Sequence, residues 1–335
     1  MKLKQALAMA VLVLGWLGLP ACASAEIIIR FSHVVAPDTP KGKAAAYFKK
    51  LAESRTGGKV RVLIYPNSQL YKDKDELEAL QLGAVQMLAP SLAKFGPLGI
   101  KEFEVFDLPY LFDDYRAVNR VLNGSLGSQL LGRLESKGIK GLAYWDNGFK
   151  NFSANHPIRR PGDLKGLKIR VQPSKVLEEE IRAVGGQPQI MAFSDVYQAL
   201  RAGVVDGAEM EGSNFYTSRA YQVQKHLTLT NHGFLGYAVI VNKKFWDGLP
   251  SDIRRTLEGA MQDATRYAND IAKQENDKAL ASIRASGKTV IYTPTAQERA
   301  AFKRALWPVH ARMASRIGPG LLQAIYRETG FRPGH

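Results

Sequence analysis

Short apolar runs alternate with helical patterns along the first third of the chain, and this alternation constrains the fold more than any other feature. Apolar runs at 27–31, 60–65 and 85–88 predict strands. Helical spacing between them predicts helices at 40–56 and 73–82. A strand–helix–strand–helix–strand run with short connections predicts a parallel sheet with helices on its faces.

A second α/β unit follows the first. Its predicted elements are a helix at 125–137, a strand at 139–145, a strand at 167–171, helices at 174–184 and 193–202, a short strand near 208 and a strand at 237–242. Two such units, with the chain passing between them more than once, predict two lobes around a cleft that holds a ligand. The helical stretch at 251–286 is long enough to run along both lobes, although two helices separated near Gly259 are an equal alternative.

The first 25 residues have the layout of a secretory signal peptide. Lys2 and Lys4 precede an apolar stretch at 6–19, and small residues at 23–25 offer a cleavage site. The stretch is shorter than the ~20 residues that span a bilayer, so we favour cleavage over retention as a membrane anchor. Lipidation at Cys22 is a further alternative. The sequence therefore predicts a periplasmic protein.

The composition limits the kinds of ligand and partner that the chain is expected to bind. Cys22 is the only cysteine, so the mature chain has no disulfide and depends on its core. The formal net charge is +15, or +13 without Lys2 and Lys4. Such an excess attracts anionic ligands or a membrane surface, or serves solubility alone. We expect no nucleic-acid partner, because basic stripes with interleaved aromatics and zinc-finger spacings are missing from the sequence.

The sequence carries no recognised catalytic signature. A G-x-S-x-G elbow, an H-E-x-x-H motif, a Walker loop and a G-x-G-x-x-G loop are all missing. The histidines are scattered: His33, His156, His226, His232, His310 and His335. We therefore predict that the protein is not an enzyme and has no cofactor, catalytic residues or metal site.

Six segments carry a resemblance to a known family. They are FSHVVAP at 31–37, YPNSQL at 65–70, DLPYLF at 107–112, KGLKIRVQPS at 165–174, MAFS at 191–194 and TNHG at 230–233. Together they resemble the C4-dicarboxylate-binding (DctP-type) periplasmic solute-binding subunits of TRAP transporters. The resemblance follows nearly all of the mature chain in order.

The resemblance implies a two-lobed periplasmic binding protein, type II-like, with a hinge and a long helix that spans both lobes. We place lobe I at 26–147 plus 235–275 and lobe II at 148–234 plus 276–335. In this family the lobes close over an organic acid anion, and the closed form docks on the membrane subunits of a TRAP permease. We expect a monomer. The alternative is a sensor that presents an organic acid to a signalling receptor.

The resemblance also implies ligand-binding residues. Arg170, in the KGLKIR segment, corresponds to the arginine that holds the ligand carboxylate, and a planar guanidinium suits a carboxylate. Lys150 is expected to reach a second carboxylate or a hydroxyl, and Asn147 to meet hydroxyls. Ser91 and Asp73 match positions that meet the far end of the ligand in some relatives.

One stretch departs from the family pattern. After Val-Asp-Gly the family commonly has Glu-Asn, with the asparagine facing the ligand, whereas this chain has Met210. A thioether cannot replace an amide, so Asn214 is expected to compensate together with Ser213. Phe193 corresponds to an aromatic that packs on the ligand. We therefore expect a ligand with an apolar or aromatic portion against Met210.

Overall fold

The computed structural model describes residues 26–332, so the predicted signal peptide and the alternative at Cys22 lie outside the described residues. Within them the strands form one mixed sheet, in the order β2-β1-β3-β8-β4-β7-β5-β6, with β9 beside β8. The strands are β1 (Ile27–Ser32), β2 (Val60–Tyr65), β3 (Met87–Leu88), β4 (Ile139–Ala154), β5 (Lys168–Val171), β6 (Gln187–Ile190), β7 (Gly207–Met210), β8 (His226–Asn242) and β9 (Val290–Tyr292).

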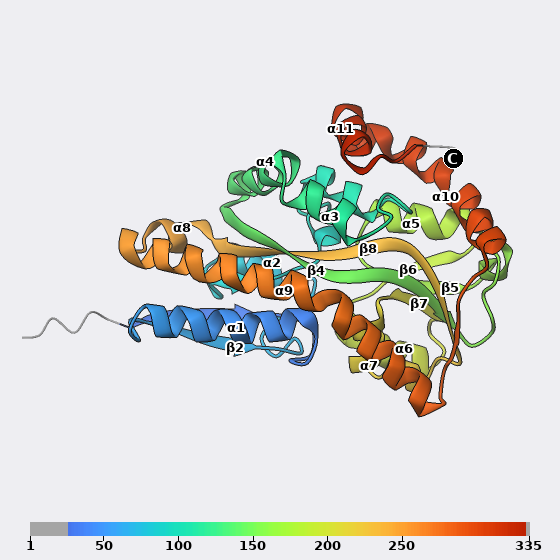
Figure 1. Cartoon of the computed structure of the whole chain (residues 1–335), viewed down its shortest axis with the longest axis horizontal. Coiled ribbons are helices and arrows are strands. Elements are labelled where there is room, and N and C mark those ends of the chain that lie inside the picture. The colour runs from blue at the N-terminus through green and yellow to red at the C-terminus, as the bar shows by residue number, and fades with distance from the viewer. Residues whose placement is uncertain (1–25, 333–335) are drawn as a thin grey trace, which may run out of the picture.

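Helices cover the sheet and extend beyond its edges (Figure 1). They are α1 (Pro40–Arg55), α2 (Glu76–Gln81), α3 (Tyr115–Leu122), α4 (Ser125–Arg133), α5 (Lys175–Ala183), α6 (Val196–Arg201), α7 (Gly212–Thr217), α8 (Lys243–Asp247), α9 (Ser251–Ser286), α10 (Ala296–Ile317) and α11 (Pro319–Thr329). Short 3₁₀ helices lie at Leu92–Lys94, Lys101–Asp107, Leu134–Lys137, Pro161–Leu164, Phe193–Asp195 and Ala220–Gln222. Across 26–332 none of the helices combines the length and the apolar character needed to cross a bilayer.

Each lobe contains a small parallel group of strands. In lobe I, β1 pairs in parallel with both β2 and β3, as the alternating pattern predicts. In lobe II, β5 pairs in parallel with β6 and β7. The helix start predicted after residue 39 is confirmed, because Thr39 accepts a hydrogen bond from the Gly42 amide and Pro40 fills the first helical position.

Two long antiparallel strands join the lobes. β4 has 16 residues and β8 has 17, and their pairing runs from Ile139 opposite Asn242 to Ala154 opposite His226. The strands predicted at 139–145 and 237–242 are only parts of them. This pair makes the sheet mixed, since β3 and β7 also pair with it in antiparallel fashion. The two-lobed α/β class is confirmed, with the lobes sharing one continuous sheet.

Helix α9 is a single helix of 36 residues, about 54 Å long at 1.5 Å per residue. This decides between the two alternatives for 251–286, and Gly259 does not interrupt it. The helix packs on α1 and β4 near one end of the molecule and on α7 near the other (Figure 1). It therefore lies along both lobes.

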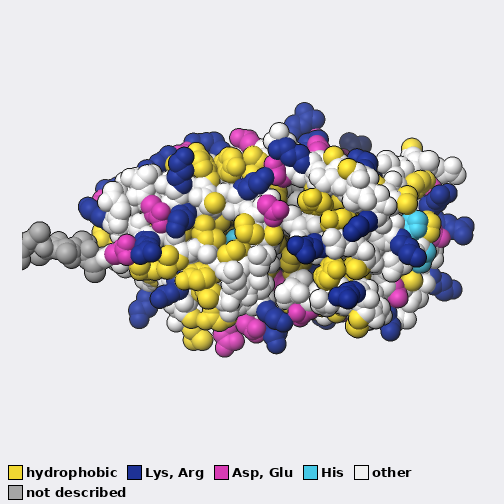
Figure 2. Space-filling view, turned by 90° about the horizontal axis from the view of Figure 1, so that it is seen from below, with side chains coloured by type: hydrophobic (Ala, Val, Ile, Leu, Met, Phe, Trp, Pro, Cys, Tyr) yellow, Lys and Arg dark blue, Asp and Glu magenta, His cyan; other side chains and the backbone are white. Residues whose placement is uncertain are grey.

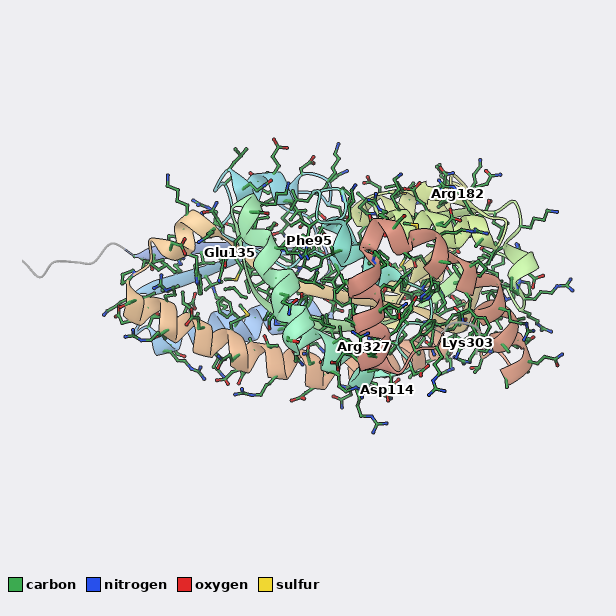
Figure 3. All side chains as sticks on the ribbon, turned by 90° about the horizontal axis from the view of Figure 1, so that it is seen from above. Phe95, Asp114, Glu135, Arg182, Lys303 and Arg327 are labelled. Atoms are coloured by element: carbon green, nitrogen blue, oxygen red, sulfur yellow. The ribbon has the colours of Figure 1, made fainter. Side chains whose placement is uncertain are left out.

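The C-terminal helices lie above the sheet in the view of Figure 1 and in front of it in Figure 3. Helix α10 packs on α5 of lobe II, whereas α11 packs on α3 of lobe I. Leu322 and Ile325 of α11 belong to the same buried cluster as Val118 of α3. The lobe boundaries remain a prediction, and this packing places α11 against lobe I rather than with the rest of 276–335.

Basic side chains are spread over the surface. On the face shown in Figure 2, Lys and Arg side chains alternate with acidic and apolar ones and form no continuous stripe.

Asn276 ties α9 to the crossing between the lobes. Its amide nitrogen donates to the Asn147 carbonyl at 2.8 Å, and its oxygen accepts from the Ser213 amide at 2.9 Å. Gly148 permits this approach, because a Cβ there would lie 2.9 Å from the Asn276 Nδ2 atom. A buried amide on α9 therefore serves backbone groups of β4 and α7.

We predict that Asn276→Ala lowers the free energy of unfolding by about 1–3 kcal/mol, because the Ser213 amide loses its side-chain acceptor and the Asn147 carbonyl keeps only the longer bond from the Tyr115 hydroxyl. Urea denaturation followed by circular dichroism measures this change. The matched control is Gln274→Ala on the exposed face of the same helix, expected within about 0.5 kcal/mol of the wild type. Equal stability of the two variants would contradict the assigned role.

Candidate functional site

Arg170 lies at the carboxyl half of β5, where the chain leaves the sheet toward the boundary between the lobes. Its side chain is 3% exposed. Nε and Nη2 donate to the Met191 carbonyl at 3.1 and 2.9 Å. Among the described residues it forms no ion pair. Burial lowers its pKa, partly offset by Asp73, Glu209 and Glu211, yet a guanidinium keeps its charge in proteins. The buried Arg170 guanidinium therefore has the Met191 carbonyl as its one hydrogen-bond acceptor among the described residues.

A small cavity adjoins this guanidinium. Its volume is about 20 Å³, and it is lined by Arg170, Gln172, Phe193, Glu209, Met210, Glu211, Asn214 and Leu235. Four predicted ligand residues, Arg170, Phe193, Met210 and Asn214, are therefore brought together by the fold. A wider hollow of about 620 Å³ is lined in part by Asp73 and by Met191, whose carbonyl accepts from Arg170.

Asn147 reaches the site through an irregularity in β4. The register of β4 against β8 shifts between Asp146 and Gly148, and such a bulge redirects a side chain. The Asn147 amide donates to the Tyr237 hydroxyl at 3.1 Å, and its oxygen accepts from Ser213 Oγ at 3.0 Å. Asn147 is fully buried and one hydrogen bond behind the cavity wall.

Ser91 and Asp73 connect lobe I to lobe II. Ser91 Oγ accepts from Gln172 Nε2 at 2.8 Å. Asp73 accepts from the Phe193 backbone amide at 2.5 Å. Both predicted residues thus contact cavity-lining residues from the opposite lobe, although neither lines the 20 Å³ cavity itself.

A buried ion triplet supports this edge of the site. Lys94 forms ion pairs with Asp73 and Glu76, and the three side chains are at most 9% exposed. Burial opposes the charge on Lys94, but the two carboxylates outweigh it and raise its pKa. Burial likewise opposes the charge on Asp73, but Lys94 outweighs it and lowers the Asp73 pKa to about 2. Lys94 therefore keeps Asp73 ionised, and the Asp73 carboxylate accepts a hydrogen bond from the Phe193 backbone amide.

Lys150 is not at the cavity wall. Its Nζ atom lies 3.1 Å from Glu209 and 3.9 Å from Asp107, and its side chain is 1% exposed. Burial raises the pKa of Asp107 to about 7. Burial also acts on Glu209, but Lys150 outweighs it and lowers the Glu209 pKa to about 2. Lys150 therefore stands behind Glu209, and its predicted reach to the ligand stays a prediction that this packing does not support.

His232 completes the buried group behind Glu209. Its ring stacks on Phe152 at 3.8 Å between centroids, and Nε2 lies 3.2 Å from Glu180 and 3.6 Å from Glu209. The ligand atoms of Glu180, Glu209 and His232 lie within 4.8 Å of one another, which is close enough for a metal ion. We assign none, because Lys150 already supplies a positive charge to this group.

Comparison with known protein families identifies the chain as a solute-binding protein. Residues 31–317 match the bacterial extracellular solute-binding proteins, family 7. The chain belongs to this family.

Named relatives and solved structures agree with this family assignment. A C4-dicarboxylate-binding periplasmic protein of Rhodobacter capsulatus is 62% identical over 93% of this chain and 94% of its own length. A TRAP periplasmic solute-binding protein of Shewanella oneidensis, solved with bound succinate, superposes with a TM-score of 0.89, at 41% identity over 91% of this chain and all of its own. One from Pseudomonas aeruginosa, with bound L-malate, gives 0.84 at 43% identity over 85% of this chain and 99% of its own.

In this solute-binding protein, sequence reasoning missed Lys41, a buried lysine that lies within electrostatic range of Glu211 but does not line the 20 Å³ cavity. It is 2% exposed, donates to the Ala89 carbonyl at 2.9 Å, and places Nζ 3.8 Å from the centre of the Tyr237 ring. Among the described residues it forms no ion pair, and burial lowers its pKa. The available signal was its place in the first turn of a helix after Thr39 and Pro40, where anions are favoured.

We predict that Lys94→Met lowers the free energy of unfolding at pH 7 by about 3–5 kcal/mol, because Asp73 and Glu76 are left buried without their cation. The loss is smaller at pH 5, since the two carboxyls then take up protons more easily. Chemical denaturation at both pH values measures the effect. Lys74→Met, an exposed lysine next to Asp73 in sequence, is the matched control. A loss no greater than that of the control contradicts the triplet's role.

Proposed function

We propose that this protein captures a small organic carboxylate, a dicarboxylate or related organic acid, in the periplasm and delivers it to a TRAP-type membrane permease. The observation that carries the proposal is Arg170, a buried guanidinium with no ion pair among the described residues. A buried charge is costly unless it is paired. A ligand carboxylate supplies the missing partner, and relatives named for C4-dicarboxylates support this class.

A second buried cation supports a ligand with two acidic groups. Lys41 from lobe I and Arg170 from lobe II both lie within electrostatic range of Asp73 and Glu211. Neither has an ion pair among the described residues. Burial lowers the Lys41 pKa to about 7, and an anion bound nearby would favour its charged form. One basic group from each lobe suits an acid whose two ends are held by opposite lobes. Such an arrangement couples binding to closure of the cleft.

Transport is favoured over sensing. The relatives from Rhodobacter capsulatus and Shewanella loihica are named C4-dicarboxylate-binding periplasmic proteins, and two solved relatives are TRAP periplasmic solute-binding proteins. The prediction that the chain is not an enzyme agrees with the names of these relatives, which are binding proteins. A chain that passes its ligand to a permease needs selective binding rather than a reaction.

We predict that Arg170→Ala weakens binding of any carboxylate ligand at least about 30-fold, because truncating one side of a buried charged pair costs about 2 kcal/mol or more. Isothermal titration calorimetry measures the dissociation constants. Arg182→Ala, on the exposed face of α5 (Figure 3), is the matched control and should bind as the wild type does. Unchanged affinity in Arg170→Ala, in a folded protein, would falsify the proposal.

The second prediction concerns Met210, which is 2% exposed in the cavity wall. We expect Met210→Asn to bind succinate more tightly than the wild type, because an amide offers a donor that the thioether lacks. The wild type should in turn favour acids with a branched or aromatic portion. Calorimetry with succinate and a series of branched and aryl acids tests both. Succinate affinity in the wild type equal to or better than in Met210→Asn contradicts the expectation.

A further inference from the structure

Glu211 places a second carboxylate in the cavity that holds Arg170. It follows β7 directly and precedes the first turn of α7. Its side chain is 3% exposed and lines the 20 Å³ cavity together with Arg170. An acid in the pocket of a protein that captures acids requires an explanation, because like charges repel strongly where water is excluded.

Only one carboxylate oxygen of Glu211 is served by described side chains. Oε2 accepts from Asn214 Nδ2 at 2.8 Å and from Asn147 Nδ2 at 3.4 Å. No described side chain donates to Oε1. Burial raises the Glu211 pKa to about 7, although Lys150, a backbone hydrogen bond of Glu211 and Asn214 act in the opposite direction. Glu211 and Arg170 therefore line the same small cavity, and the Glu211 carboxylate has acceptor capacity that no described side chain uses.

Charged and titratable groups face Glu211 from every strand of the site. They are Lys41 on α1, Lys150 on β4, Arg170 on β5, Glu209 on β7 and Tyr237 on β8. Lys150 is already paired with Glu209. Arg170 and Lys41 are left to balance both Glu211 and an incoming acid. A ligand that brings only carboxylates therefore meets Glu211 as a repulsive neighbour.

We propose that Glu211 is a specificity-determining residue that accepts a hydrogen bond from a hydroxyl carried next to the ligand carboxylate. The site then selects hydroxy acids over plain dicarboxylates. The inference rests on the proposed function, since it assumes that Arg170 holds the carboxylate. A site built to accept from a ligand hydroxyl disfavours the analogue that lacks it, because its buried acceptor is left unpaired.

Calorimetry with L-malate and succinate, which differ by one hydroxyl, tests the inference. In the wild type we expect malate to bind at least about tenfold more tightly than succinate. In Glu211→Gln, an isosteric change that keeps the side-chain volume, the ratio falls below about threefold because succinate binds more tightly. Glu258→Gln, on the exposed face of α9, is the control and keeps the wild-type ratio.

The pH dependence gives a second readout. Between pH 6 and 8 Glu211 loses its proton in the free protein, since its pKa is about 7. Succinate affinity therefore falls as the pH rises in the wild type, and falls less in Glu211→Gln. Taking the difference between the two proteins removes the contributions of Lys41, Asp107 and the other groups that both proteins share.

The outcomes separate this inference from the proposed function. Equal affinity for malate and succinate in the wild type, or an unchanged ratio in Glu211→Gln, overturns the role of Glu211 while leaving capture of carboxylates intact. If the wild type binds neither acid nor any other carboxylate, the proposed function falls and the inference falls with it. A collapsed ratio in Glu211→Gln, with Arg170→Ala losing both acids, supports both.

Discussion

The antiparallel pairing of β4 with β8 is the constraint on which the rest of the structure depends. Both strands pass from one lobe into the other, so each lobe's parallel strands attach to opposite ends of one ladder. Its irregularity at Asn147 lies at the crossing, and α9 is tied to the same point through Asn276. The ligand groups are thus presented from a shared backbone, although they come from segments far apart in sequence.

The buried charges around this crossing are divided into two kinds. Lys94 and Lys150 have carboxylate partners and hold Asp73 and Glu209 in their ionised forms. Arg170 has only a backbone carbonyl. An unpaired buried charge destabilises the fold more than a paired one. The paired lysines therefore stabilise the structure around the site, whereas the Arg170 guanidinium is the group that an anionic ligand would pair with. This division explains why a strongly charged interior is compatible with selective binding.

Local pattern was enough to predict the parallel start of lobe I, the strand that carries Arg170 and the α/β class. It could not predict the lengths of β4 and β8, because their extensions are specified by pairing with each other and not by apolar periodicity. For the same reason Lys150 was expected at the ligand, whereas its partner Glu209 comes from a distant strand. Lys41 and Glu211 were missed because their neighbours are distant in sequence: Ala89 and Tyr237 contact Lys41, and Asn147 contacts Glu211.

Contacts between the lobes hold the closed form in the structure, and a bound ligand adds further contacts to them. The 20 Å³ cavity has room for about one water molecule, so a four-carbon acid enters only when the lobes part. The bridges between them include the exposed pair of Lys72 and Asp195, 2.9 Å apart, and such pairs contribute at most about 1 kcal/mol. A ligand that touches Arg170 from one lobe and first-lobe groups from the other binds the closed form better than the open one. Under the proposed function, this difference in affinity is what shifts the population toward closure.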